Sequence, residues 1–132
     1  MKDKANEVTP QRSSEDSTLN TPLVEMDLDN FITHIKQETT WATNDHSSVT
    51  IFKSRSMRIV LVGLHENSEL KKHTANGIIS VQVLEGKINF TAEQKTVSLE
   101  KGQMIALQDK IPHSVVAVQE SFFLLTLAMS DR

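Results

Sequence analysis

From residue 48 onward, short runs of β-branched and apolar residues alternate with polar breaks. The runs are VTIFK, MRIVLVGL, IISVQVLEG, INFTA, TVSL, QMIALQ, SVVAV and FFLLTLAM, and the breaks include HENSELKK, AEQK and EKG. Runs of this length and composition are typical of β-strands. Several of them at this spacing predict an all-β domain, an antiparallel sandwich or barrel, over residues 48–130.

A helical periodicity precedes the strands, within residues 23–47. Four apolar residues of DLDNFITHIKQE fall on one helical stripe: Leu28, Phe31, Ile32 and Ile35. Asp27 or Asp29 can cap the first turn. Because so short a helix is marginal alone, we expect the stripe to pack on the barrel or on another subunit, with His34 at the surface. Trp41, in the linker that follows, is expected to anchor it to the barrel or to sit at a pocket mouth.

Two strand runs, IVLVGL and FFLLTLAM, are apolar on both faces. Such strands are covered on both sides, here either by the preceding helix or by a partner subunit. We therefore expect a homodimer. Residues 1–22 are polar and hold few apolar side chains, which cannot offset an ordering cost of roughly 1–2 kcal/mol per residue. They predict a disordered tail, unless the tail pairs with a partner subunit.

The composition narrows the function classes. The chain of 132 residues has room for one domain, and its formal charge of −3 gives no basic field for nucleic acid. It has no cysteine, which excludes disulfides and thiolate metal sites. No apolar run is long enough for a membrane span or resembles a signal peptide. We expect a cytoplasmic protein with neither nucleic-acid nor membrane partners.

Two stretches keep a spacing that is typical of one protein family. In the first stretch, the residues at this spacing are Asn67, His73, Ala75, Ile79 and Gly86. In the second stretch, they are Gly102, Gln108, Lys110, His113 and Ala117. Over roughly residues 48–128, this spacing resembles the two motifs of cupins, Gly…His-x-His…Glu…Gly and Gly…Pro-x-Gly…His…Asn. The segments HTANGIISVQVLEG and IPHSVVAV resemble a group of small bacterial cupins whose first motif reads His-x-Ala.

The resemblance implies a fold and a pocket. The fold is an antiparallel double-stranded β-helix, the jelly-roll barrel of RmlC-like cupins, here behind a short helix. Gly86 and Gly102 would form turns with positive φ, a conformation that Asn67 also tolerates. Side chains two apart share a strand face. The implied pocket therefore combines two imidazoles with an apolar wall, namely His73, His113, Ala75, Ile79, Val81 and Val83.

The same resemblance raises the question of a metal. In cupins, two histidines and a glutamate of the first motif and the histidine of the second converge on one ion, and Ala75 and Ile79 replace two of these ligands. His73 and His113 alone fall short of the usual three protein ligands for Fe, Mn, Ni or Zn. An isoleucine wall also disfavours a divalent charge. The residues that could refill the site, none of them by spacing alone, are His65, Glu66, Glu69, Gln82 and Gln108.

Three functions remain open, and the sequence does not decide whether the protein is an enzyme. The one we favour is a binding cupin whose barrel pocket holds a small organic molecule through His73 and His113. The second is a metal-dependent cupin enzyme of the dioxygenase or isomerase type. The third is a non-catalytic interaction or sensor domain. No phosphate loop, nucleophile elbow or cysteine nucleophile points elsewhere, and no catalytic residue is assigned.

Overall fold

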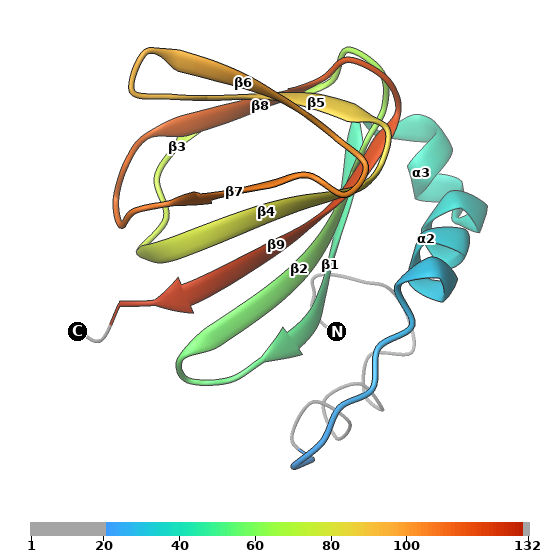
Figure 1. Cartoon of the computed structure of the whole chain (residues 1–132). Coiled ribbons are helices and arrows are strands. Elements are labelled where there is room, and N and C mark those ends of the chain that lie inside the picture. Colours follow the sequence, from blue (N-terminus) through green and yellow to red (C-terminus); the bar gives the residue numbers. More distant parts are fainter. Residues whose placement is uncertain (1–20, 131–132) are drawn as a thin grey trace.

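The computed structural model describes residues 21–130, so nearly all of the predicted tail lies outside the described residues. The described chain runs through two helices into nine strands (Figure 1). Their bounds are α2 Leu28–Gln37, α3 Thr39–Thr43, β1 His46–Lys53, β2 Met57–Leu64, β3 Glu69–His73, β4 Gly77–Glu85, β5 Lys87–Ala92, β6 Lys95–Glu100, β7 Met104–Leu107, β8 His113–Ala117 and β9 Ser121–Met129.

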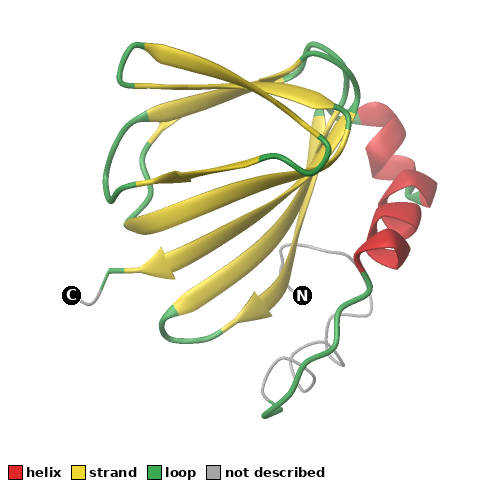
Figure 2. Cartoon of the chain, viewed as in Figure 1, coloured by secondary structure: helices red, strands yellow, loops and turns green. Residues whose placement is uncertain are grey.

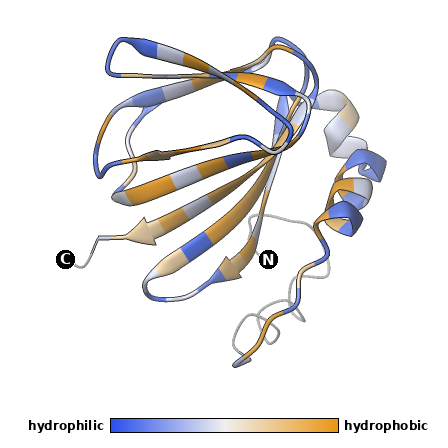
Figure 3. Cartoon of the chain, in the orientation of Figure 1, coloured by the Kyte–Doolittle hydropathy of each residue, from blue (hydrophilic) through white to orange (hydrophobic). Residues whose placement is uncertain are grey.

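The strands form two antiparallel sheets that face each other across one core (Figure 2). The larger sheet has the order β1-β2-β9-β4-β7 and the smaller one β3-β8-β5-β6. Alternate residues of the strands point into the space between the sheets, as the burial pattern of β4 shows. Hydrophobic residues concentrate along strands such as β2 and β4 (Figure 3). The all-β antiparallel architecture predicted from the strand runs is confirmed.

A second apolar layer covers the outer face of the larger sheet. Asp27 accepts a hydrogen bond from the Asn30 amide and caps α2, as predicted. Ile32 and Ile35 of α2 are buried against the sheet, in one cluster with residues from β1, β2 and β9. Within the chain, this helix therefore covers part of the second apolar face of β2 and β9. The homodimer is not needed to explain that part, and it stays a prediction.

Two local predictions were wrong. The second half of the polar segment HENSELKK, predicted to be a break, forms β3, an edge strand of the smaller sheet paired only with β8. Its residues are mostly exposed and only Leu70 packs against the core, so the strand lacks an apolar pattern. The linker after α2 contains a second short helix, α3, around the buried Trp41. Among the described residues, neither helix is long and apolar enough to cross a membrane.

The barrel has two ends of different character. We call the end with the turns at residues 54–56, 74–76, 93–94 and 108–112 the histidine end. A backbone hydrogen bond from Lys110 to Ala75 joins two of its turns, and bonds from Met129 to Ser56 and from Ser130 to Asn76 join two turns to the end of β9. The turns at residues 65–68, 86, 101–103 and 118–120 form the opposite end, near α3 (Figure 1).

The glycine positions of the motif-like stretches lie in turns of this opposite end. Asn67, Gly86 and Gly102 all have positive φ, as predicted. A Cβ on Gly86 would also collide with the carbonyl oxygen of Glu120. These positions therefore serve the fold, and the chemistry has to come from elsewhere.

Candidate functional site

His73 and His113 lie side by side at the histidine end. They are register partners at the end of β3 and the start of β8. Their ring centroids are 4.4 Å apart, with an interplanar angle of 59°. His113 is only 4% exposed, whereas His73 is exposed at the barrel rim. The two imidazoles are therefore close enough to contact one small molecule. The alternation along the strand predicted that His73 points into the barrel, and this prediction was wrong because His73 is exposed.

Each ring is held by one nitrogen. The Nδ1 of His73 lies 2.7 Å from the carbonyl oxygen of Lys71, and the Nδ1 of His113 lies 2.9 Å from that of Ile111. A carbonyl only accepts hydrogen bonds, so both Nδ1 atoms carry a proton. In the neutral ring, the lone pair is then on Nε2. No described residue forms a hydrogen bond with either Nε2, which leaves both available to a ligand.

The environment of His113 favours its neutral form. Burial lowers the pKa of His113 below its ordinary value, and the charge of His73 lowers it further. The hydrogen bond to the Ile111 carbonyl acts in the opposite direction and is smaller than the burial effect. His113 is therefore a neutral hydrogen-bond acceptor at neutral pH.

Phe90 connects His113 to a cavity. Its ring stacks on that of His113 at 5.5 Å and 12°, and it is only 3% exposed. The neighbouring Ala92 is the register partner of His113. Both residues also line a cavity of about 250 Å³ between the β5–β6 hairpin and β7. The cavity is lined by Phe90, Ala92, Glu93, Lys95, Val97, Ile105, Ala106 and Leu107.

The apolar wall that was predicted from β4 lies in the barrel core. Ile79, Val81 and Val83 are almost fully buried there, and Ala75 packs against them. None of these four lines the 250 Å³ cavity, although Ile79 pairs with the cavity residue Leu107. Sequence reasoning missed the cavity residues. The alternation in KINFTA and KTVSLE could have placed Phe90 and Val97 inside, but not next to β7.

The donor set does not fit a metal centre. Within residues 21–130, no three His, Cys, Asp or Glu side chains are grouped so that they could hold an ion. Of the substitutes considered above, Gln82 lies on the opposite face of β4 from Ile79 and Val81. Two imidazoles are fewer than the three protein ligands of open catalytic zinc sites. The function proposed for this site therefore does not involve a divalent Fe, Mn, Ni or Zn ion.

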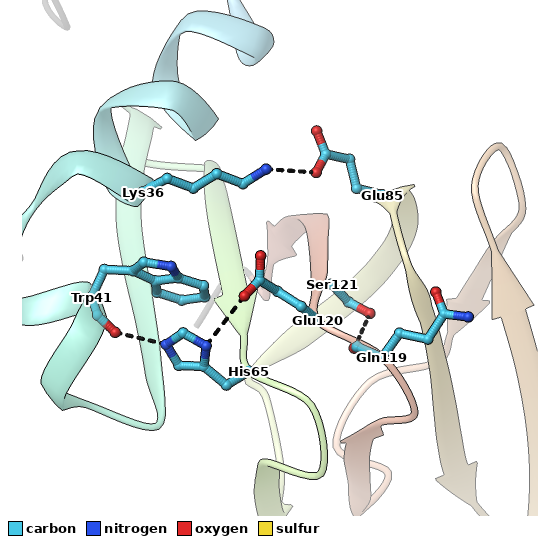
Figure 4. A network of polar contacts seen from close by, with 7 residues as sticks. All are labelled: Lys36, Trp41, His65, Glu85, Gln119, Glu120 and Ser121. Carbon is cyan, nitrogen blue, oxygen red and sulfur yellow. Dashed lines mark hydrogen bonds and ion pairs between the residues drawn. The ribbon is translucent and has the colours of Figure 1, made fainter.

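His65 lies at the opposite end and has a structural environment (Figure 4). Its Nε2 contacts the Trp41 carbonyl oxygen at 2.6 Å, and its Nδ1 lies 3.3 Å from a carboxylate oxygen of Glu120. Its ring also stacks on the indole of Trp41, at 3.7 Å between centroids. Trp41 is buried and contacts Phe122, which confirms the predicted anchor.

Searches with family models and against curated proteins found no match to this chain. Solved structures do match. A conserved protein of unknown function from Streptococcus pyogenes is 26% identical, with a TM-score of 0.62 over 66% of this chain and 76% of that one. An RmlC-like cupin from Desulfovibrio desulfuricans is also 26% identical, with a TM-score of 0.59 over 63% and 81%.

A larger relative by structure is the salicylate 1,2-dioxygenase of Pseudoaminobacter salicylatoxidans. It has a TM-score of 0.73 at 16% identity, over 84% of this chain but only 36% of that one. At this identity, the likeness concerns the fold alone. Together with the RmlC-like neighbours, it shows that the chain has an all-β barrel fold like that of these cupins.

Proposed function

We propose that this protein is a small-molecule-binding cupin whose ligand contacts His73 and His113 at the histidine end. The observation that supports it is that the two rings have the same hydrogen-bonding arrangement. Each has its Nδ1 fixed by a backbone carbonyl and its Nε2 without a described partner, at 4.4 Å between centroids. A ligand that donates hydrogen bonds to both Nε2 atoms would satisfy them.

Binding is favoured over metal catalysis because of the residues at the motif positions. Ala75 and Ile79 supply no metal ligand where the cupin motif has a histidine and a glutamate. The His-x-Ala form of the first motif supports placing the chain in the corresponding group of small cupins. The activity of the structurally similar dioxygenase is therefore not transferred to this chain.

A fragment screen followed by ring NMR tests the proposal. Compounds that bind should shift the ring signals of His73 and His113 and leave those of the exposed His34 unchanged. The double variant His73→Ala/His113→Gln should bind these compounds about tenfold more weakly or worse, given roughly 0.5–1.5 kcal/mol per hydrogen bond. His34→Ala is the matched control. Binding that is unaltered in the double variant would refute the role of the two histidines.

The homodimer is part of the same proposal. The outer face of the larger sheet, beyond the area covered by α2, exposes Ile78, Met104 and Met57 at 48%, 54% and 37%. Ile78 and Met57 both pair with Ala128 across adjacent strands, so these three residues form one continuous apolar surface. Such a patch suits a symmetric contact with a second copy. Sedimentation should show a dimer that Ile78→Lys converts to monomer, whereas Thr33→Lys on α2 should not.

A further inference from the structure

The two barrel ends differ in charge. At the histidine end, the described residues of the turns and adjoining strand ends are mostly basic: Lys53, Arg55, Arg58, Lys71, Lys72, Lys95 and Lys110 against Glu93 and Asp109. At the opposite end they are mostly acidic: Glu66, Glu69, Glu85, Glu100 and Glu120 against Lys87 and Lys101. The chain has a formal charge of −3, so the basic end is a local excess against the overall sign.

The charges also differ in whether they are paired. The lysine–carboxylate ion pairs found within residues 21–130, Lys36–Glu85 and Lys87–Glu100, both lie toward the acidic end, as does the contact between His65 and Glu120. At the histidine end, Lys72, Lys95 and Lys110 have no carboxylate partner among the described residues. Unpaired cations around a recess attract anions and raise their local concentration. This end therefore favours a negatively charged ligand.

The cavity beside Phe90 sets the size and the polarity of such a ligand. Its volume of about 250 Å³ lies below the range of about 300–1,000 Å³ for drug-sized ligands and above the roughly 150 Å³ that holds benzene. Phe90, Val97, Ile105 and Leu107 give it apolar walls, and the exposed Lys95 is the basic residue among those that line it. A single ring or a short branched chain fits this space.

We infer that the ligand is a small organic anion whose apolar body enters the β5–β7 cavity while its anionic group pairs with Lys95. This rests on the proposed function and deepens it, since Phe90 both lines the cavity and stacks on the ring of His113. The ammonium of Lys95 supplies charge selectivity, whereas the two Nε2 atoms accept hydrogen bonds from donors on the same ligand. Glu93, which also lines the cavity, disfavours a second negative charge near the edge.

Matched probes separate the contribution of charge from that of shape. Benzoate and benzamide have nearly the same size; benzoate carries the charge, whereas benzamide is neutral and carries N–H donors. 3-Methylbutanoate and 3-methylbutanamide form the corresponding aliphatic pair. In amide and methyl NMR titrations, we expect benzoate to shift Ile105 and Leu107 and to bind about tenfold more tightly than benzamide. A tenfold ratio equals about 1.4 kcal/mol. The advantage of the anion should shrink as NaCl is raised.

Variants then locate the charge effect. Lys95→Met should reduce benzoate affinity to that of benzamide and leave benzamide unchanged, while Lys101→Met at the opposite end should change neither. Equal binding of the acid and the amide, or no binding of either pair, would overturn the inference. Benzoate has no hydrogen-bond donor for the two Nε2 atoms, so His73→Ala/His113→Gln should weaken the binding of benzamide and leave that of benzoate unchanged. Benzamide binding that is unaltered in this variant, with benzoate binding that needs Lys95, would support the inference and refute the proposed histidine contacts. Preference for 3-methylbutanoate over benzoate would still support the anion and assign it an aliphatic body.

Discussion

The histidines at the two ends of the barrel are of the same residue type and have opposite environments. His65 uses both ring nitrogens, toward a carbonyl and a carboxylate, and its ring stacks on Trp41. His73 and His113 each use one nitrogen and leave the other without a described partner. A histidine whose bonding capacity is filled by its own chain is a structural group. A ring nitrogen that no residue of the chain contacts, near an apolar cavity, can form a hydrogen bond with a ligand.

The same contrast applies to the charges. Glu85 and Glu100 at the opposite end pair with lysines, and one of these pairs joins α2 to β4. Lysines of the histidine end lack such partners within the described residues. The comparison thus assigns stability to one end and ligand recognition to the other. The variants below test that division, from the largest expected effect to the smallest.

Trp41→Ala should have the largest effect on stability and none on binding. The indole is 7% exposed and contacts both His65 and Phe122, so its removal leaves a cavity under α3. Loss of a buried tryptophan costs about 3–5 kcal/mol. Urea unfolding should show this loss, and Thr33→Ala on the exposed face of α2 should stay within about 0.5 kcal/mol of the parent. A loss of benzoate affinity in folded Trp41→Ala would show that the two ends are coupled.

His65→Ala and His73→Ala compare the two kinds of histidine directly. Removal of His65 leaves the Trp41 carbonyl oxygen without its side-chain partner and unstacks the indole, for which we expect a loss of about 1–3 kcal/mol. His73 is exposed and bonds only to Lys71 of its own strand, so its removal should change stability by less than about 0.5 kcal/mol. Equal losses in urea unfolding would contradict the division.

The pH dependence of stability tests the buried member of the pair. Because the pKa of His113 is lowered in the folded state, the unfolded chain binds more protons at this residue as the pH falls. The free energy of unfolding should therefore be highest above the ordinary histidine pKa of about 6.5 and decrease below it. Urea unfolding across this range should show a shallower slope for His113→Gln. A slope that is the same in the variant would place the effect elsewhere.

How far the sequence predicted this molecule depends on how local each signal is. The stripe of α2 and the alternation of β4 involve neighbouring residues, and both predictions were confirmed. β3 was missed because an edge strand facing water needs no apolar pattern. The cavity was missed because β6 and β7 end different sheets and form no ladder with each other, so no register relates Val97 to Ile105. That His65 is structural also depends on distant residues, Trp41 and Glu120.

Glu120→Gln should have the smallest effect and reveals which contact of His65 matters. The carboxylate is 47% exposed, and exposed ion pairs contribute about 0.2–1 kcal/mol. Glutamine keeps an acceptor oxygen for Nδ1, so we expect a loss at the low end of that range, which disappears at high salt in urea unfolding. Glu100→Gln, which removes the charge from the Lys87 pair, is the matched control. If Glu120→Gln instead cost as much as His65→Ala, the carboxylate rather than the Trp41 carbonyl and indole would hold the ring, and the opposite end would depend on charge as much as the histidine end does.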